Sequence, residues 1–142
     1  MKDLSEVNES LYDEIVSNVE SGNKLSSSKS YESALKVYAT ALEMLPEPKN
    51  KWELYHWIAK CNCHAYLGLK DYISAKEWAH EAVETKPPRD TYSLILLGIC
   101  LIETNEKELA YESLKKAFDM GGNRAFQGVE RKYLDFVNGY EE

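Results

Sequence analysis

Glycine, proline and cysteine are scarce in this sequence, and their scarcity narrows the choice of fold. Only 7 glycines and 4 prolines occur in 142 residues, whereas an all-β protein needs a turn about every 8–12 residues. The three cysteines, Cys61, Cys63 and Cys100, are odd in number and poorly spaced for a disulfide framework. We therefore expect a helical protein that resides in the reducing cytoplasm.

Basic charge and long apolar runs are also lacking. Lysine and arginine number 17 against 24 aspartates and glutamates, for a net charge of −7. Nucleic-acid-binding surfaces are basic, so we expect no nucleic-acid partner, whereas a basic protein partner would suit the charge. The run Leu94–Ile102 is too short to span a bilayer, and the first residues, MKDLSEVNES, hold no apolar segment of signal-peptide length. No membrane association is expected.

One set of spacings occurs three times along the chain. An alanine follows a small residue by 12 positions in the pairs Gly22–Ala34, Cys63–Ala75 and Gly98–Ala110. The positions 4, 7 and 12 after that alanine hold Tyr38, Ala41 and Pro46, then Ala79, Ala82 and Pro87, then Leu114, Ala117 and Gly122. Small residues let two helices approach, residues 4 and 7 apart share a helical face, and proline or glycine ends a helix.

This pattern resembles the tetratricopeptide repeat, in which two helices occupy about 34 residues. Frames of that length run over 15–48, 56–89 and 91–124. The resemblance implies an all-α fold, a right-handed superhelical stack of antiparallel helix pairs with about seven helices. It predicts a single domain over 1–142.

Two segments depart from the repeat. Residues 49–55 are inserted before the second frame, and we expect them to extend its first helix backward, to about 50–68, with Trp52 against the first repeat. Apolar residues at helical spacing suggest that the first helix starts near residue 5.

The chain after the third frame has its own apolar pattern. Tyr133, Leu134, Phe136 and Val137 supply one apolar face, which Phe126 can join. The last repeat of a solenoid needs a cover. We therefore expect a capping helix over 129–138, followed by an acidic tail, 139–142, that frays.

No group of residues in the sequence supports catalysis. It contains no GxSxG, HExxH, P-loop or dinucleotide-binding motif. Cys61 and His64 share a helical face and form at best half of a metal site. We predict no catalytic residue, no metal and no cofactor. An enzyme that uses Cys61 and His64 is a minor alternative, and it requires both side chains to reach solvent on one face.

The resemblance implies binding of peptides or helices in a concave groove lined by the first helix of each repeat. Some members of the family hold the acidic C-terminus of heat-shock chaperones in a clamp of lysine and asparagine side chains. Asn23 matches the first asparagine of this clamp, but Val19 occupies the place of its lysine partner. The other clamp positions fall on Cys61, Tyr92 and Leu96. We conclude that the clamp is missing.

Apolar and mixed side chains occupy the expected groove instead. The inner positions are Trp57, Lys60, His64 and Leu67 in the second repeat, and Tyr92, Ile95, Ile99 and Ile102 in the third. The third opening helix is apolar on both faces, so its concave side needs a cover. Three covers are considered: the chain's own N-terminal helix, a second copy of the protein, or a foreign helix or peptide.

These observations predict a non-catalytic protein-binding module of adaptor or co-chaperone type, which holds a partner's helix or peptide in the groove, with Asn23 at its edge. One alternative is a bacterial immunity protein or antitoxin-like inhibitor that binds one cognate toxin tightly. Another is a homodimer formed through the groove. An adaptor should have several partners of moderate affinity, whereas an immunity protein should have one very tight partner.

Overall fold

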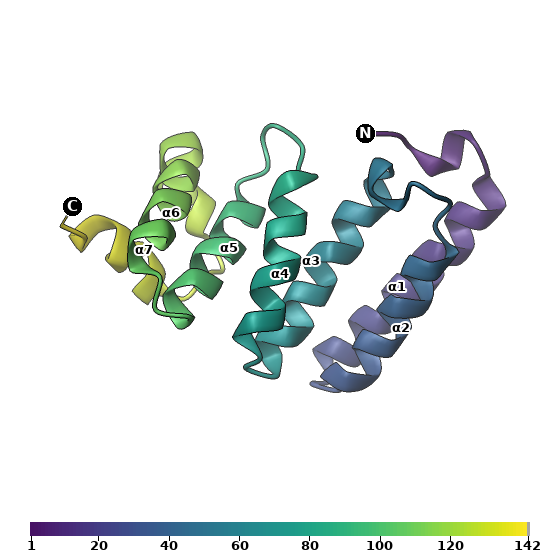
Figure 1. Cartoon of the computed structure of the whole chain (residues 1–142), viewed down its shortest axis with the longest axis horizontal. Coiled ribbons are helices and arrows are strands. Elements are labelled where there is room, and N and C mark those ends of the chain that lie inside the picture. The colour runs from purple at the N-terminus through teal and green to yellow at the C-terminus, as the bar shows by residue number, and fades with distance from the viewer. Residues whose placement is uncertain (142) are drawn as a thin grey trace. The chain divides into compact units, whose positions relative to one another are not determined.

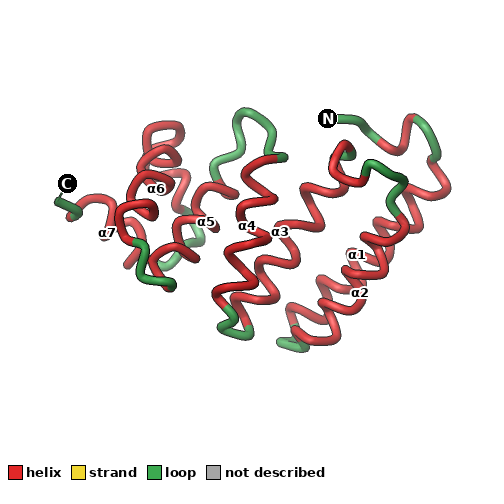
Figure 2. Tube along the Cα trace, in the orientation of Figure 1, coloured by secondary structure: helices red, strands yellow, loops and turns green. Residues whose placement is uncertain are grey.

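The computed structural model describes residues 1–141, and in that range it contains seven α-helices and no strand (Figures 1 and 2). They are α1 Glu9–Ser27, α2 Tyr31–Met44, α3 Glu53–Gly68, α4 Tyr72–Glu84, α5 Tyr92–Glu103, α6 Lys107–Gly121 and α7 Arg131–Gly139. The chain divides into two compact units, Met1–Thr85 with α1–α4 and Lys86–Glu142 with α5–α7. The single domain expected over 1–142 stays a prediction.

Each copy of the spacing pattern folds as a pair of antiparallel helices, α1 with α2, α3 with α4, and α5 with α6 (Figure 1). The three repeat alanines are fully buried; they are Ala34, Ala75 and Ala110. Gly22 lies against the ring of Tyr38, where a Cβ would be 2.5 Å from Cε1. Gly98 lies equally close to Leu114, at 2.4 Å from Cγ. The small residues of the pattern thus mark helix crossings.

The turn inside each pair has the same backbone conformation in all three copies. A non-glycine residue with positive φ ends the first helix; these residues are Lys29 (65°), Lys70 (60°) and Asn105 (62°). The next residue donates its N–H to a carbonyl five positions back, in Ser30 to Leu25 (2.8 Å), Asp71 to Tyr66 (3.0 Å) and Glu106 to Leu101 (2.8 Å). This is a Schellman cap, whose left-handed residue is most often glycine.

Replacing Lys70 with glycine should raise the free energy of unfolding by roughly 1 kcal/mol, because glycine adopts positive φ without the steric cost of a Cβ. Lys70 is exposed, so little packing is lost with its side chain. Lys70→Ala is the matched control, since alanine keeps the Cβ and should bring no such gain. Urea denaturation of both variants measures the difference, and equal stabilities would contradict the explanation.

The segment between the first two helix pairs differs from the prediction. We expected one helix over 50–68, but α3 begins at Glu53, after a 3₁₀ turn at Lys49–Lys51 and an extended Trp52. The backbone N–H of Glu53 donates to the carbonyl of Lys2 (2.9 Å), and the N–H of Lys2 donates to the carbonyl of Lys51 (2.9 Å). A longer helix would need the same Glu53 N–H for its own i→i−4 bond. The pairing with the N-terminal segment therefore prevents α3 from extending backward beyond Glu53.

The N-terminal segment is also not helical where the sequence predicted it. The first α-helix starts at Glu9 rather than near residue 5, and a 3₁₀ turn, Leu4–Glu6, precedes it. Asn8 caps α1, because its Oδ1 accepts a hydrogen bond from the N–H of Leu11 at 3.1 Å. Leu4 and Trp52 are both buried in the hydrophobic core of the first unit. The inserted segment is thus packed between the N-terminus and the first helix pair.

The chain ends on α7, Arg131–Gly139, close to the helix that we expected over 129–138. Tyr133 and Val137 of α7 are buried, as is Phe126 before it, and α7 packs against α6. Tyr140, within the tail that we expected to fray, stacks on Tyr111 with ring centroids 4.6 Å apart. The last residue of that tail, Glu142, lies outside the described residues.

Candidate partner-binding surface

Four of the predicted partner-binding residues form one row along α3. Trp57, Lys60, His64 and Leu67 are spaced by 3, 4 and 3 positions, which places them on one helical face. His64 is exposed and the other three are half-buried. The indole of Trp57 packs against the hydrophobic core of the first unit. The α3 row therefore presents large side chains whose outer surfaces are open to solvent.

Lys60 supplies the charge of the α3 row at neutral pH. Although His64 is exposed, its pKa lies below its ordinary value, first because neighbouring residues exclude part of the water around the ring, and second because the Lys60 ammonium disfavours a second positive charge. His64 is therefore a neutral hydrogen-bonding group on this face.

The predicted residues of α5 have the same spacing but a different exposure. Tyr92, Ile99 and Ile102 are half-buried, whereas Ile95 is fully buried. Our expectation that Ile95 lines an open surface is therefore corrected. Eight of the 12 residues of α5 are buried, and a helix that is apolar all round does not reveal from its sequence which side chains are covered.

Asn23, the remaining predicted residue, is engaged inside the first unit. Its Oδ1 accepts a hydrogen bond from the hydroxyl of Tyr38 at 2.6 Å. Against the larger effect of burial, which raises the pKa of the Cys61 thiol, the nearby side chains of Asn23 and Tyr38 both act to lower that pKa. The hydrogen bond joins α1 to α2, and Cys61 places α3 beside it. This structural role accounts for Asn23 without a partner.

Comparisons with known proteins bear on the fold of the chain. No protein-family model matches the chain. Over 113 residues, 79% of its length, the chain is 29% identical to the small glutamine-rich tetratricopeptide repeat-containing protein 2 of Saccharomyces cerevisiae, and the match spans 30% of that protein. The crystal structure of the Sgt2 TPR domain from Aspergillus fumigatus matches 91% of this chain and 85% of that one, with a TM-score of 0.66 and 21% identity. The chain has the tetratricopeptide-repeat fold. The all-α class predicted from the spacing is confirmed.

The Cys61 thiol is not set up as a nucleophile. Burial raises its pKa to about 11, and burial likewise raises the pKa of Tyr38 to about 12. A reactive cysteine has a lowered pKa and an accessible thiolate. Cys61 is buried whereas His64 is exposed, so the two do not reach solvent together. This geometry argues against the Cys61–His64 enzyme.

Iodoacetamide should modify Cys61 slowly in the folded protein. With the pKa near 11 rather than 9.0, the thiolate fraction at pH 8 falls about 100-fold, and burial slows access further. Mass spectrometry of native and urea-unfolded samples measures the rate at each cysteine. All three cysteines should react readily in urea, and rapid native modification of Cys61 would contradict its placement.

Among residues 1–141, no three histidine, cysteine, aspartate or glutamate side chains converge to hold a metal ion. No helix in that range is long and apolar enough to cross a bilayer.

Proposed function

We propose that this chain is a non-catalytic protein-binding module of adaptor type that holds a helix or peptide of a partner protein. The observation that carries the proposal is the α3 row, where Trp57, Leu67 and His64 keep open surface that internal packing has not used. Large aromatic and aliphatic anchors beside a few polar groups are typical of peptide-binding faces. The tetratricopeptide-repeat fold supports the same function.

Each residue of the α3 row has a proposed role. The indole of Trp57 and the side chain of Leu67 are apolar anchors, and Lys60 supplies a positive charge for a partner carboxylate or carbonyl. His64, neutral at pH 7, donates or accepts one hydrogen bond. On α5, the half-buried Ile99 and Ile102 are proposed as separate apolar contacts.

The test compares partner capture by the wild-type chain and by His64→Glu/Leu67→Glu, followed by calorimetric titration of each captured partner. Loss of a hot-spot contact at an interface costs about 2 kcal/mol or more, so we expect affinity to fall at least about tenfold. Ile99→Glu tests the α5 contacts separately. The matched control is Ile73→Glu on α4, where the side chain is 60% exposed and lies outside both rows. Circular dichroism verifies that each variant is folded.

The results also separate the candidate kinds of partner. Several captured proteins of moderate affinity would indicate an adaptor, and one very tight partner would indicate an immunity or antitoxin-like inhibitor. Light scattering reveals a homodimer, which the same variants should dissociate. If the α3 and α5 variants both bind every partner as tightly as the wild type, the proposed surface is wrong.

A further inference from the structure

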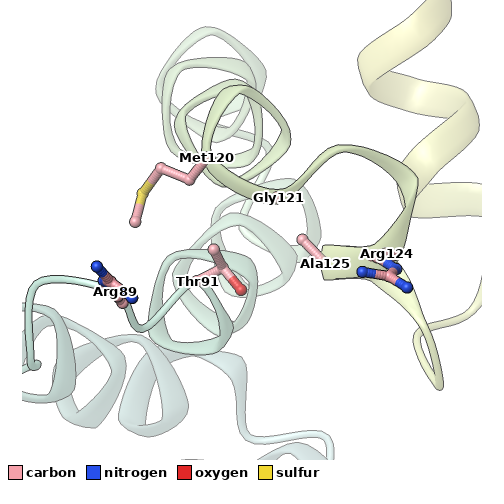
Figure 3. Close-up of a pocket in the computed structure, with 6 residues that line it drawn as sticks. All are labelled: Arg89, Thr91, Met120, Gly121, Arg124 and Ala125. Carbon is pink, nitrogen blue, oxygen red and sulfur yellow. The ribbon is translucent and has the colours of Figure 1, made fainter.

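A hollow within the second unit is separate from both predicted rows (Figure 3). It lies where the segment before α5 meets the end of α6, and its volume is about 770 Å³. Its lining residues are Arg89, Thr91, Met120, Gly121, Arg124 and Ala125.

Two of the chain's three arginines line this hollow, although the protein has a net charge of −7. The third, Arg131, forms an ion pair with Asp135, with 3.6 Å between Nε and Oδ1. Among residues 1–141, by contrast, neither Arg89 nor Arg124 forms an ion pair. Both side chains are exposed. Their guanidinium groups are therefore available to an anionic ligand.

The acidic side chains nearest in sequence already have partners. Asp90 accepts hydrogen bonds from the N–H of Tyr92 (2.9 Å) and the hydroxyl of Ser93. Asp119 accepts from the ammonium of Lys115, with its two oxygens at 3.1 and 3.3 Å. The C-terminus of α6 adds a partial charge equivalent to about −0.5, which is smaller than the charge of two guanidinium groups. The lining itself holds two cationic side chains and no acidic one. Asp90 keeps its negative charge beside Arg89, so the net charge around the hollow is weakly positive.

The floor of the hollow, between the two arginines, is formed by the small residues Thr91, Gly121 and Ala125. A Cβ on Gly121 would lie 3.0 Å from the Cβ of Ala125 and 3.7 Å from the Cγ2 of Thr91, so glycine lets both residues pack closely against the end of α6. Met120 borders it with a side chain that is 47% exposed. Figure 3 shows the two arginines on opposite sides of Thr91 and Ala125. An occupant would thus meet apolar surface between two cationic groups.

We propose that the hollow binds an acidic peptide segment of a partner protein in which two carboxylate side chains flank an apolar one. Guanidinium groups bind carboxylates through paired charge-assisted hydrogen bonds. The apolar side chain would lie on Met120 and Ala125, between Arg89 and Arg124. An inorganic anion would bind the two guanidinium groups, but it would leave the floor of the hollow exposed to water. It would also fill only a small part of the hollow's volume.

In the test, the full chain is titrated into a fluorescein-labelled peptide that contains Glu-Leu-Glu. The fluorescence anisotropy of the peptide measures binding. A peptide with glutamine in place of both glutamates is the matched ligand, and it should bind at least tenfold more weakly. Raising NaCl from 50 to 500 mM should weaken binding of the acidic peptide, since salt screens exposed charges. Inorganic phosphate is titrated separately as the small-anion probe.

Variants of the chain distinguish the contribution of the two arginines of the hollow to peptide binding from the effect of the protein's net charge. Arg89→Ala and Arg124→Ala should each weaken the acidic peptide about tenfold, as expected for loss of a hydrogen bond between charged groups. Arg131→Ala removes the same charge outside the hollow and should bind like the wild type. Ala125→Phe keeps both arginines but fills the floor, so it should also lose the peptide. Circular dichroism verifies the fold of each.

Equal weakening by Arg131→Ala and Arg89→Ala would overturn the proposal, because net charge alone would then explain the binding. Binding of phosphate without binding of the acidic peptide would overturn it in favour of a small-anion site, and no binding of either probe would also overturn it. The inference does not depend on the α3 row. His64→Glu/Leu67→Glu should keep the acidic peptide, so failure at one site is distinguishable from failure at the other.

Discussion

Replacing Gly98 with alanine is expected to lower the free energy of unfolding by about 2–3 kcal/mol, the upper range for overpacking a core. The added Cβ would lie 2.4 Å from Cγ and 2.5 Å from Cδ2 of Leu114. Leu114 is fully buried, so its side chain cannot swing into solvent. The helices α5 and α6 would have to separate to admit the methyl group. Chemical denaturation measures the change.

A double-mutant cycle with Leu114→Ala tests this cause. Leu114→Ala alone should cost about 2–5 kcal/mol through the cavity that it creates. The double variant should cost less than the sum of the two, because the space left by Leu114 accepts the new Cβ. Gly139→Ala is the control, since no atom lies within 4 Å of a Cβ there. Additive effects in the cycle would contradict a clash between positions 98 and 114.

Replacing Trp52 with alanine is the second large effect, and it should cost about 3–5 kcal/mol as for other buried aromatic residues. The side chain is only 4% exposed. Its Nε1 donates a hydrogen bond to the carbonyl of Pro46 at 3.0 Å. Loss of the indole removes both the packing and this bond, so the segment that joins α2 to α3 loses its main attachment.

Trp52→Phe is the matched variant, because it keeps an aromatic ring and removes the hydrogen bond. It should cost less, about 1–3 kcal/mol. Hydrogen exchange gives a local measurement, since the amides of Lys2 and Glu53 pair beside Trp52 and should exchange faster in Trp52→Ala. If these amides exchanged at the wild-type rate in Trp52→Ala, or if Trp52→Ala and Trp52→Phe were equally stable, the proposed role of the indole would be contradicted.

The repeat spacing predicted the helix pairs well because its marks are local. Gly22, Ala34 and Tyr38 lie within two adjacent helices, and the period of an α-helix determines which of them share a face. The spacing does not give the backbone conformation of the turns inside the pairs. Their left-handed conformation at Lys29 and Lys70 has no glycine to reveal it, and it became apparent from the backbone.

The candidate site was predicted in part. The spacing of Trp57, Lys60, His64 and Leu67 placed them on one face of α3, as the structure has them. The use of this face for binding stays a prediction. Asn23 was selected for its match to a clamp position, but its hydrogen bond to Tyr38 joins residues 15 positions apart. The hollow between Arg89 and Arg124 had no signal in the spacing, because its two sides lie 35 positions apart.

The sequence by itself determined the class of fold, the number of repeats and the positions of the helix crossings. These depend on helical periodicity and on the size of side chains within two neighbouring helices, both of which can be read along the chain. Only the tertiary structure decided where α3 begins, that Ile95 is covered, and that two arginines border one hollow. Each of these depends on groups from distant parts of the chain, such as the carbonyl of Lys2 that takes the N–H of Glu53. The energy of such pairings is set by proximity in space, which no local spacing encodes.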